Sequence, residues 1–177
     1  RLAARATARR SGANPTVREQ GLDADQARAA AEVASTRPLV VVEGAAGAGK
    51  TTMLGAAIRA AERESRAVRL VTPTKKAAEV AASELGVPTD SVAAHGFRWN
   101  TDGVWTRLAP GDADPETGAT YRGPSKDAQL VPGERIVVDE AGMLDQDTAL
   151  ALLTVADEAG ATLTLVGDRA QLPAVGR

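Results

Sequence analysis

The sequence contains no cysteine and only one histidine, and Phe, Trp and Tyr together make up 2% of it. Without cysteine there is no disulfide framework, no thiolate metal site and no cysteine nucleophile, which suits a reducing compartment. No apolar run approaches the ~20 residues that span a bilayer, and the Arg-rich start lacks the apolar middle of a secretory signal. We therefore expect a soluble cytoplasmic protein without a membrane partner.

The chain also has little net charge. Its formal charge of -2 excludes a globally basic nucleic-acid binder, although a local basic groove remains compatible with it. Its 177 residues are enough for one domain, and a domain of this size buries roughly 70% of the surface of its unfolded chain. Because the first residue is arginine rather than methionine, we expect a piece of a longer protein.

Composition divides the chain near residue 20. Residues 1–20 are rich in Arg and Ala and have no apolar stripe, so we interpret them as a linker or a flexible arm. Residues 21–177 form the domain. Asp23 followed by Gln26 is a capping-box signature, which predicts a helix that begins near Asp23.

Apolar segments then alternate with helical ones. The β-branched runs at 38–44, 67–73, 135–140 and 161–168 lack period-two alternation, which is typical of strands that are buried on both faces. Helical patterns follow from Lys50, through 75–86 and over 146–160. Strands interleaved with helices predict an α/β fold in which helices sandwich a parallel sheet.

An insertion at about 97–132 breaks this alternation. Its segment "RWNTDGVWTRL" has an Asp-Gly turn between two short β-like runs, which predicts a small hairpin. The insertion also holds Phe97, Trp99, Trp105 and Tyr121. These rings could form a satellite core under the hairpin; in a protein that grips single-stranded DNA, Phe97 and Trp99 could instead stack on its bases.

The segment "GAAGAGKT" has the spacing of a P-loop between a predicted strand and a predicted helix. Its glycines let backbone N–H groups surround an anion at a helix N-terminus, and this context favours a phosphate site over a chance glycine-rich turn. Lys50 would reach the β- and γ-phosphates, and Thr51 would ligate Mg²⁺. The expected nucleotide-binding residues here are Gly44, Ala45, Ala46, Gly47, Ala48, Gly49, Lys50, Thr51 and Thr52.

Two carboxylates follow the apolar strand in "RIVVDEAGML". Asp139 would hold Mg²⁺ through water, and Glu140 would orient and deprotonate the attacking water. Without the P-loop, the pair would instead suggest ordinary acidic capping of a helix. The guanine-reading Asn-Lys-x-Asp pattern is missing, so the expected cofactors are ATP and Mg²⁺.

From about Leu22 to Arg177 the order of these motifs resembles superfamily 1 DNA helicases of the RecD-like branch, and more closely the helicase part of TraA/TraI-type conjugative relaxases. The resemblance implies a P-loop NTPase with a RecA-like fold. It implies that Gln26 holds the adenine, whereas the residues alone explain Gln26 equally well as a cap. It also implies that Asp168 and Gln171 in "GDRAQLP" lie beside Asp139 and Glu140, with Gln171 sensing the γ-phosphate.

The resemblance further implies contacts with single-stranded DNA. In "VTPTKKAAEV" the candidate residues are Thr72, Pro73, Thr74, Lys75 and Lys76, although a solvated lysine pair is the alternative. His95 matches a second DNA motif, in which Ala93 replaces the usual threonine, and it could equally be a structural histidine.

The implied function is the first of two RecA-like lobes of a helicase with 5′-to-3′ polarity. An arginine from a second lobe completes such sites, so we expect this chain alone to bind ATP, hydrolyse it slowly and not unwind DNA. A P-loop nucleotide or small-molecule kinase and a nucleotide-binding scaffold without motor activity are the alternatives. The residues do not distinguish a relaxase parent from a stand-alone helicase.

Overall fold

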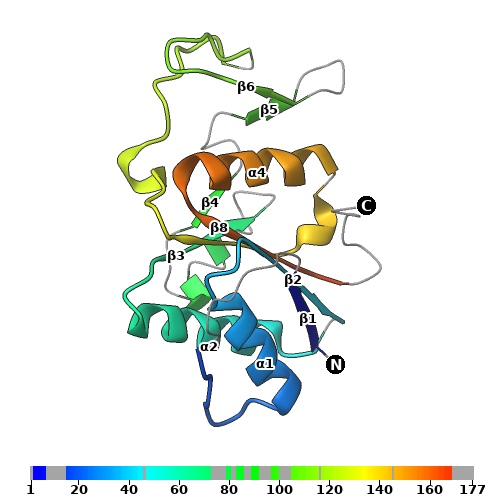
Figure 1. The fold of residues 1–177 in the computed structure, drawn as a ribbon. Helices are drawn as coiled ribbons and strands as arrows, with labels where there is room; N and C mark the ends of the chain where they lie inside the picture. The colour runs from blue at the N-terminus through cyan, green and yellow to red at the C-terminus, as the bar shows by residue number, and fades with distance from the viewer. Residues whose placement is uncertain are drawn as a thin grey trace.

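The structure is a computed structural model, drawn in Figure 1. It is described for the residues 2–6, 15–45, 47–72, 79–80, 83–85, 89–91, 97–99, 105–115, 117–144 and 146–168.

A six-stranded sheet forms the centre of the described part of the chain. All neighbouring strands in it run parallel except the first pair, which is antiparallel. The four strands expected from the apolar runs are therefore confirmed, and they occupy the four central positions. In spatial order the strands are β1 (Leu2–Ala6), β2 (Leu39–Gly44), β8 (Thr162–Gly167), β7 (Arg135–Val138), β3 (Val68–Thr72) and β4 (Thr89–Ser91).

The first residues correct the expectation of a flexible arm. Leu2–Ala6 form the edge strand β1, which pairs with β2 from Leu2 opposite Gly44 to Ala6 opposite Val40. Backbone hydrogen bonds, which carry no side-chain signature, account for this pairing. Val17 is also buried, so the part of the chain before residue 21 contributes to the core.

Helices cover both faces of the sheet. α1 (Ala24–Val33) and α2 (Lys50–Arg63) pack together on one face, and α4 (Gln146–Ala159) lies on the other (Figure 1). The predicted starts near Asp23 and at Lys50 are confirmed, because Asp23 is the N-cap of α1 and Lys50 begins α2. In the predicted helix 75–86, the described residues 79–80 and 83–85 are helical.

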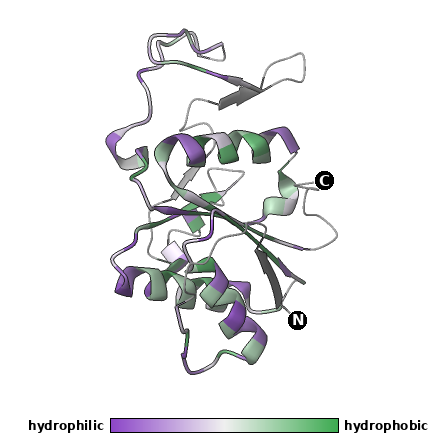
Figure 2. Ribbon diagram, in the orientation of Figure 1, coloured by the Kyte–Doolittle hydropathy of each residue, from purple (hydrophilic) through white to green (hydrophobic). Residues whose placement is uncertain are grey.

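The core has two layers, one on each face of the sheet. Val33, Val42 and Met53 belong to the layer beside α1 and α2, and Leu152 and Leu163 belong to the layer beside α4. In Figure 2 α4 is hydrophobic in its middle and hydrophilic at its ends. Each fully buried leucine contributes roughly 1.5–3 kcal/mol through the hydrophobic effect. The two layers therefore fix the sheet between the helices.

Arg135 is fully buried at the start of β7. Its guanidinium donates hydrogen bonds to the carbonyl oxygens of Leu163, at 3.2 Å, and of Ser35. Burial, together with the nearby Arg66, lowers the pKa of Arg135 to about 10, while Glu32 opposes the change. This side chain ties the end of α1 to the amino edge of the sheet.

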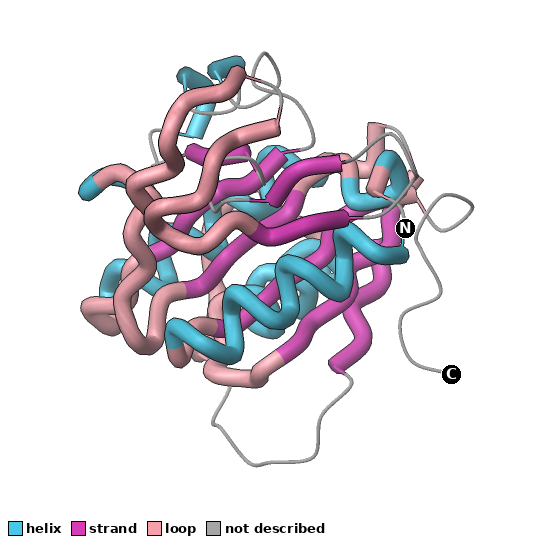
Figure 3. Tube along the Cα trace, turned by 90° about the horizontal axis from the view of Figure 1, so that it is seen from above, coloured by secondary structure: helices cyan, strands magenta, loops and turns pink. Residues whose placement is uncertain are grey.

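The insertion contains the predicted hairpin. β5 (Phe97–Trp99) and β6 (Trp105–Arg107) pair antiparallel, with Phe97 opposite Arg107. β6 packs on α4. A long loop segment with one short 3-10 helix, η2 (Lys126–Ala128), then leads to β7, and it lies on the left of Figures 1 and 3.

Candidate active site

The parallel strands bring the predicted site residues to one edge of the sheet. Glu43 lies opposite Gly167, so the P-loop and Asp168 leave neighbouring strands. The Asp139 N–H donates to the Val71 carbonyl at 3.2 Å, which places Asp139 beside the end of β3. Because β8 lies between β2 and β7, the P-loop strand and the Asp139 strand are about 10 Å apart. This spacing leaves room for phosphates and a hydrated metal ion.

The P-loop has the backbone geometry of an anion site. Gly47 and Gly49 both have a φ of 75°, a left-handed conformation that glycine adopts without steric cost. Gly49 is the N-cap of α2, and no side chain caps this helix start. The first-turn N–H groups of α2 are therefore not satisfied by a cap, and the helix dipole adds to their attraction for an anion.

Lys50 and Thr51 stand in the first turn of α2. Thr51 and Thr52 are exposed, and no acidic residue in this turn opposes an anion. Among the described residues no group of three His, Cys, Asp or Glu side chains could hold a metal ion. One hydroxyl and one carboxylate suit Mg²⁺, which keeps several waters and takes its other ligands from substrate phosphates. The residues present fit a Mg²⁺-nucleotide.

Glu140 has a strained backbone. Its φ of 55° and ψ of 36° are left-handed, which is uncommon for a residue other than glycine. Its N–H donates to Oδ1 of Asp139 at 2.9 Å, and the 3-10 helix η3 (Ala141–Met143) follows. The Glu140 side chain is exposed at this edge, whereas Asp139 is half-buried. Strain of this kind concentrates at functional sites.

Gln26 contacts the P-loop directly. Its Nε2 donates to the Ala48 carbonyl at 3.1 Å, although the two residues are 22 positions apart. The predicted capping box is also present, because Oε1 of Gln26 accepts from the Asp23 N–H at 3.0 Å and Oδ1 of Asp23 accepts from the Gln26 N–H at 2.8 Å. The side chain thus serves the cap and the loop together.

The predicted DNA residues do not all lie at this edge. Thr72 ends β3 there, but it is only 2% exposed. Phe97 pairs with Arg107, which forms an ion pair with Glu158 near the far end of α4. The 14 residues of α4 correspond to roughly 21 Å. The start of β5 is therefore tied to the opposite side of the domain, and stacking of Phe97 and Trp99 on DNA stays a prediction.

Several predicted site residues lie outside the described part of the chain, and their roles stay predictions. They are Ala46 of the P-loop, Gln171 of the final motif, and the DNA candidates Pro73, Thr74, Lys75, Lys76 and His95.

Comparison with known proteins agrees with this geometry. The family described as "AAA domain" matches residues 21–177. The chain belongs to the AAA domain family. Its α/β fold, a parallel sheet between helices with a P-loop, is therefore confirmed as RecA-like.

Two relatives of this AAA domain carry conjugation names. The chain is 32% identical over 155 residues to the "Probable conjugal transfer protein TraA" of Sinorhizobium fredii, and the match covers 88% of this chain and 12% of that protein. It is 30% identical over 168 residues to the "Conjugal transfer protein TraA" of Rhizobium radiobacter, covering 91% and 13%. The predicted resemblance to TraA-type proteins is confirmed, and the chain spans about an eighth of their length.

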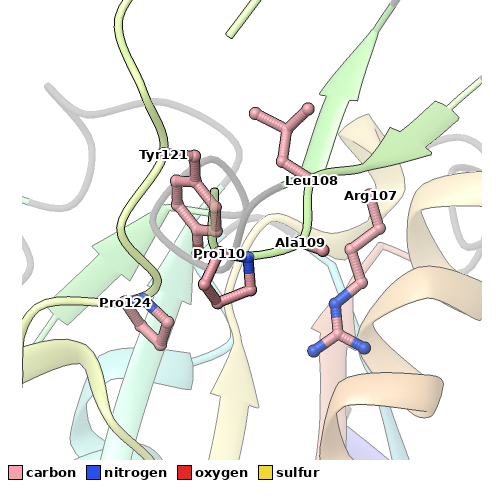
Figure 4. Close-up of a pocket in the computed structure, with 6 residues that line it drawn as sticks. All are labelled: Arg107, Leu108, Ala109, Pro110, Tyr121 and Pro124. Atoms are coloured by element: carbon pink, nitrogen blue, oxygen red, sulfur yellow. The ribbon is translucent and has the colours of Figure 1, made fainter. Parts of the chain in front are cut away.

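The AAA domain also has a hollow away from the carboxyl edge of the sheet, where the P-loop lies (Figure 4). It measures about 350 Å³ and is lined by Arg107, Leu108, Ala109, Pro110, Tyr121 and Pro124. A second hollow shares Arg107 and Pro124 and reaches Glu158 and Ala159 at the end of α4. Since that end of α4 leads into the start of β8, both hollows lie at the amino edge of the sheet, opposite the P-loop. No helix in the described ranges is long and apolar enough to cross a membrane.

Sequence reasoning missed two features of the site. The left-handed backbone of Glu140 has no signal in the residue type. The contact between Gln26 and Ala48 joins two segments that were each recognised, but their side-by-side placement depends on the packing of α1 against α2. The one signal for this contact was the family resemblance, which implies that Gln26 lies close to the nucleotide held by the P-loop.

Proposed function

We propose that this chain is the ATP-binding and ATP-hydrolysing first motor lobe of a DNA helicase that translocates on single-stranded DNA, within a conjugative relaxase. The observation that carries the proposal is the convergence of the P-loop, Asp139, Glu140 and Asp168 on one sheet edge. The similarity to two TraA proteins supports the conjugative setting.

The loop amides and Lys50 hold the phosphates, and Thr51 and Asp139 hold Mg²⁺ with its waters. Bound Mg²⁺ neutralises charge that develops on the phosphates. Glu140 orients the attacking water and accepts its proton, for which its exposed position at the sheet edge is suitable. Asp168 follows β8 between the two halves of the site, and we assign the γ-phosphate contact to Gln171.

Gln26 retains unused hydrogen-bonding groups that could contact the adenine. A glutamine amide has two N–H groups and two acceptor lone pairs, and the cap and the Ala48 carbonyl use one of each. The remaining N–H and lone pair are complementary to the donor and acceptor on one edge of adenine. Adenine recognition by Gln26 is therefore compatible with its commitment to the cap.

The DNA-binding part of the proposal rests on residues 72–76 and His95. Thr72 ends β3 and residues 73–76 follow it in sequence, whereas His95 follows β4, the parallel neighbour of β3. Since the carboxyl end of β3 lies beside Asp139, a strand of DNA bound there would be close to the site of hydrolysis. Contacts to phosphodiester oxygens through hydroxyls, backbone N–H groups and lysines are independent of sequence. The 5′-to-3′ polarity, and a second RecA-like lobe of the parent chain that completes the site, follow from the family resemblance.

ATPase measurements with and without oligo-dT test the proposal, on this chain and on the longer parent chain. We expect slow hydrolysis by this chain without unwinding, and hydrolysis by the parent chain that single-stranded DNA stimulates. Turnover that requires a small phosphate acceptor would identify a kinase instead. Nucleotide binding without any DNA-stimulated turnover of the parent would identify a scaffold module, and either result would refute the motor function.

A further inference from the structure

The Gln26 amide has one possible orientation. The Asp23 N–H can only donate, so it requires the amide oxygen, and the Ala48 carbonyl can only accept, so it requires the amide nitrogen. Its two partners therefore fix which side of the amide faces the P-loop. The cap does not compete with the loop contact but aims the Nε2 group at it.

α1, the helix that carries Gln26, is attached at both of its ends to the carboxyl half of α2 and the turn that follows it. Before α1, Glu19 accepts hydrogen bonds from Arg59 Nε at 3.1 and 3.2 Å. After α1, the Ser35 carbonyl accepts from Arg66 Nη1 at 3.1 Å. Since α2 begins directly at the P-loop, these attachments and the packing of α1 against α2 fix the helix of Gln26 relative to the helix that starts at the loop.

The peptide between Ala48 and Gly49 is the element that Gln26 controls. No peptide bond in the described ranges is cis, and in a planar trans peptide the C=O and N–H point in opposite directions. When the Ala48 carbonyl points at Gln26, the Gly49 N–H points away from Gln26, and an anion held at the start of α2 on that side would accept its hydrogen bond. A Cβ on Gly49 would lie 2.2 Å from Nε2 of Gln26, so the amide also packs against this glycine.

This peptide needs an anchor because a glycine follows Ala48. Rotation of the Ala48–Gly49 peptide changes ψ of Ala48 and φ of Gly49, and Gly49, whose φ is 75°, tolerates either sign of φ, so the rotation meets little steric resistance on its side. Rotation would turn the carbonyl oxygen toward a bound phosphate and the N–H away from it. The Gln26 hydrogen bond opposes that rotation.

We propose that Gln26 is a positioning residue for phosphate binding, because it holds the Ala48–Gly49 peptide with its N–H toward the anion. This inference rests on the proposed nucleotide site and adds to the adenine contact. It predicts that Gln26 strengthens binding of every polyphosphate, including one without a base.

The test is the affinity of this chain for two Mg²⁺ complexes, that of ATP and that of inorganic tripolyphosphate, measured by calorimetry. In Gln26→Met the side chain keeps its length and neutrality but loses both hydrogen bonds. We expect this substitution to weaken the binding of tripolyphosphate about 3- to 10-fold, the effect of one net hydrogen bond. It should weaken the binding of ATP by at least as much.

Asp23→Ala is the matched control, since it removes the Oδ1 acceptor of the cap and leaves Gln26 able to reach Ala48. We expect a lower melting temperature in this variant but tripolyphosphate affinity within about twofold of wild type. The inference is overturned if Gln26→Met weakens the binding of ATP but not of tripolyphosphate, or if both variants lose affinity for tripolyphosphate equally. Wild-type protein that binds neither ligand would instead refute the proposed nucleotide site itself.

Discussion

The left-handed backbone at Glu140 predicts which of two substitutions at this position gives the more stable protein. Both Glu140→Gly and Glu140→Ala remove the carboxylate, so both lose hydrolysis, and only glycine relieves the strain of a φ of 55°. We therefore expect the glycine variant to be the more stable of the two.

The magnitude follows from two opposing effects. A left-handed conformation costs an L-residue roughly 1–2 kcal/mol. Glycine loses roughly 0.5–1 kcal/mol more backbone entropy on folding than alanine. The difference favours glycine at position 140 by about 0.5–1 kcal/mol. At the exposed helical position Glu62 the order reverses, and alanine is favoured by about 1 kcal/mol.

Thermal unfolding without nucleotide measures both pairs. A change of 1 kcal/mol shifts the melting temperature of a domain of this size by about 2–4 °C. The difference in melting temperature between the glycine and the alanine variant should therefore have opposite signs at positions 140 and 62, and the two differences should lie several degrees apart. Ser65, with a φ of 58°, is a second left-handed position and should behave like Glu140. If alanine stabilises position 140 relative to glycine as it does position 62, the strain argument is wrong.

Three further predictions concern charge. Lys50→Ala should abolish ATPase activity while the melting temperature stays within a few degrees of wild type, as steady-state kinetics and thermal unfolding would show. Glu134→Ala should destabilise the chain by about 3–5 kcal/mol in denaturant titrations, because it leaves the buried charge of Arg69, 2.9 Å away, without its carboxylate; a loss below 1 kcal/mol would contradict this. The hydrogen bond from Arg59 lowers the pKa of Glu19 in the folded protein. The stability that this pair contributes is therefore complete above the pKa of Glu19 in the unfolded chain, and it is lost as the pH falls through the pKa of Glu19 in the folded protein. Glu19→Gln should therefore cost about 0.2–1 kcal/mol at pH 7 and converge with wild type at pH 2, and a gap that persists in acid would exclude this cause.

The sequence predicted the central fold because its signals are local. The apolar run of β7 and the capping box at Asp23 each determine an element from neighbouring residues alone. Parallel strands then place their carboxyl ends together, so the meeting of the P-loop with Asp139 also followed.

Features that depend on tertiary contacts were not predicted. β1 is held by backbone pairing with β2, and its Arg- and Ala-rich residues give no strand pattern. Arg135 is buried because the carbonyls of Ser35, just after α1, and of Leu163 in β8 accept its hydrogen bonds, which the expectation of an apolar strand does not include. The orientation of the Gln26 amide likewise depends on two partners from distant segments.

The central claim is that the sheet edge hydrolyses ATP with Glu140 as the base, and Glu140→Gln tests it most directly. This substitution keeps the size of the side chain and removes its basicity. The measurement is Mg²⁺-ATP affinity and hydrolysis rate, side by side with wild type. We predict affinity within a few-fold of wild type and hydrolysis slower by about 10²-fold or more, as for loss of a general base. Hydrolysis at the wild-type rate would contradict the assignment.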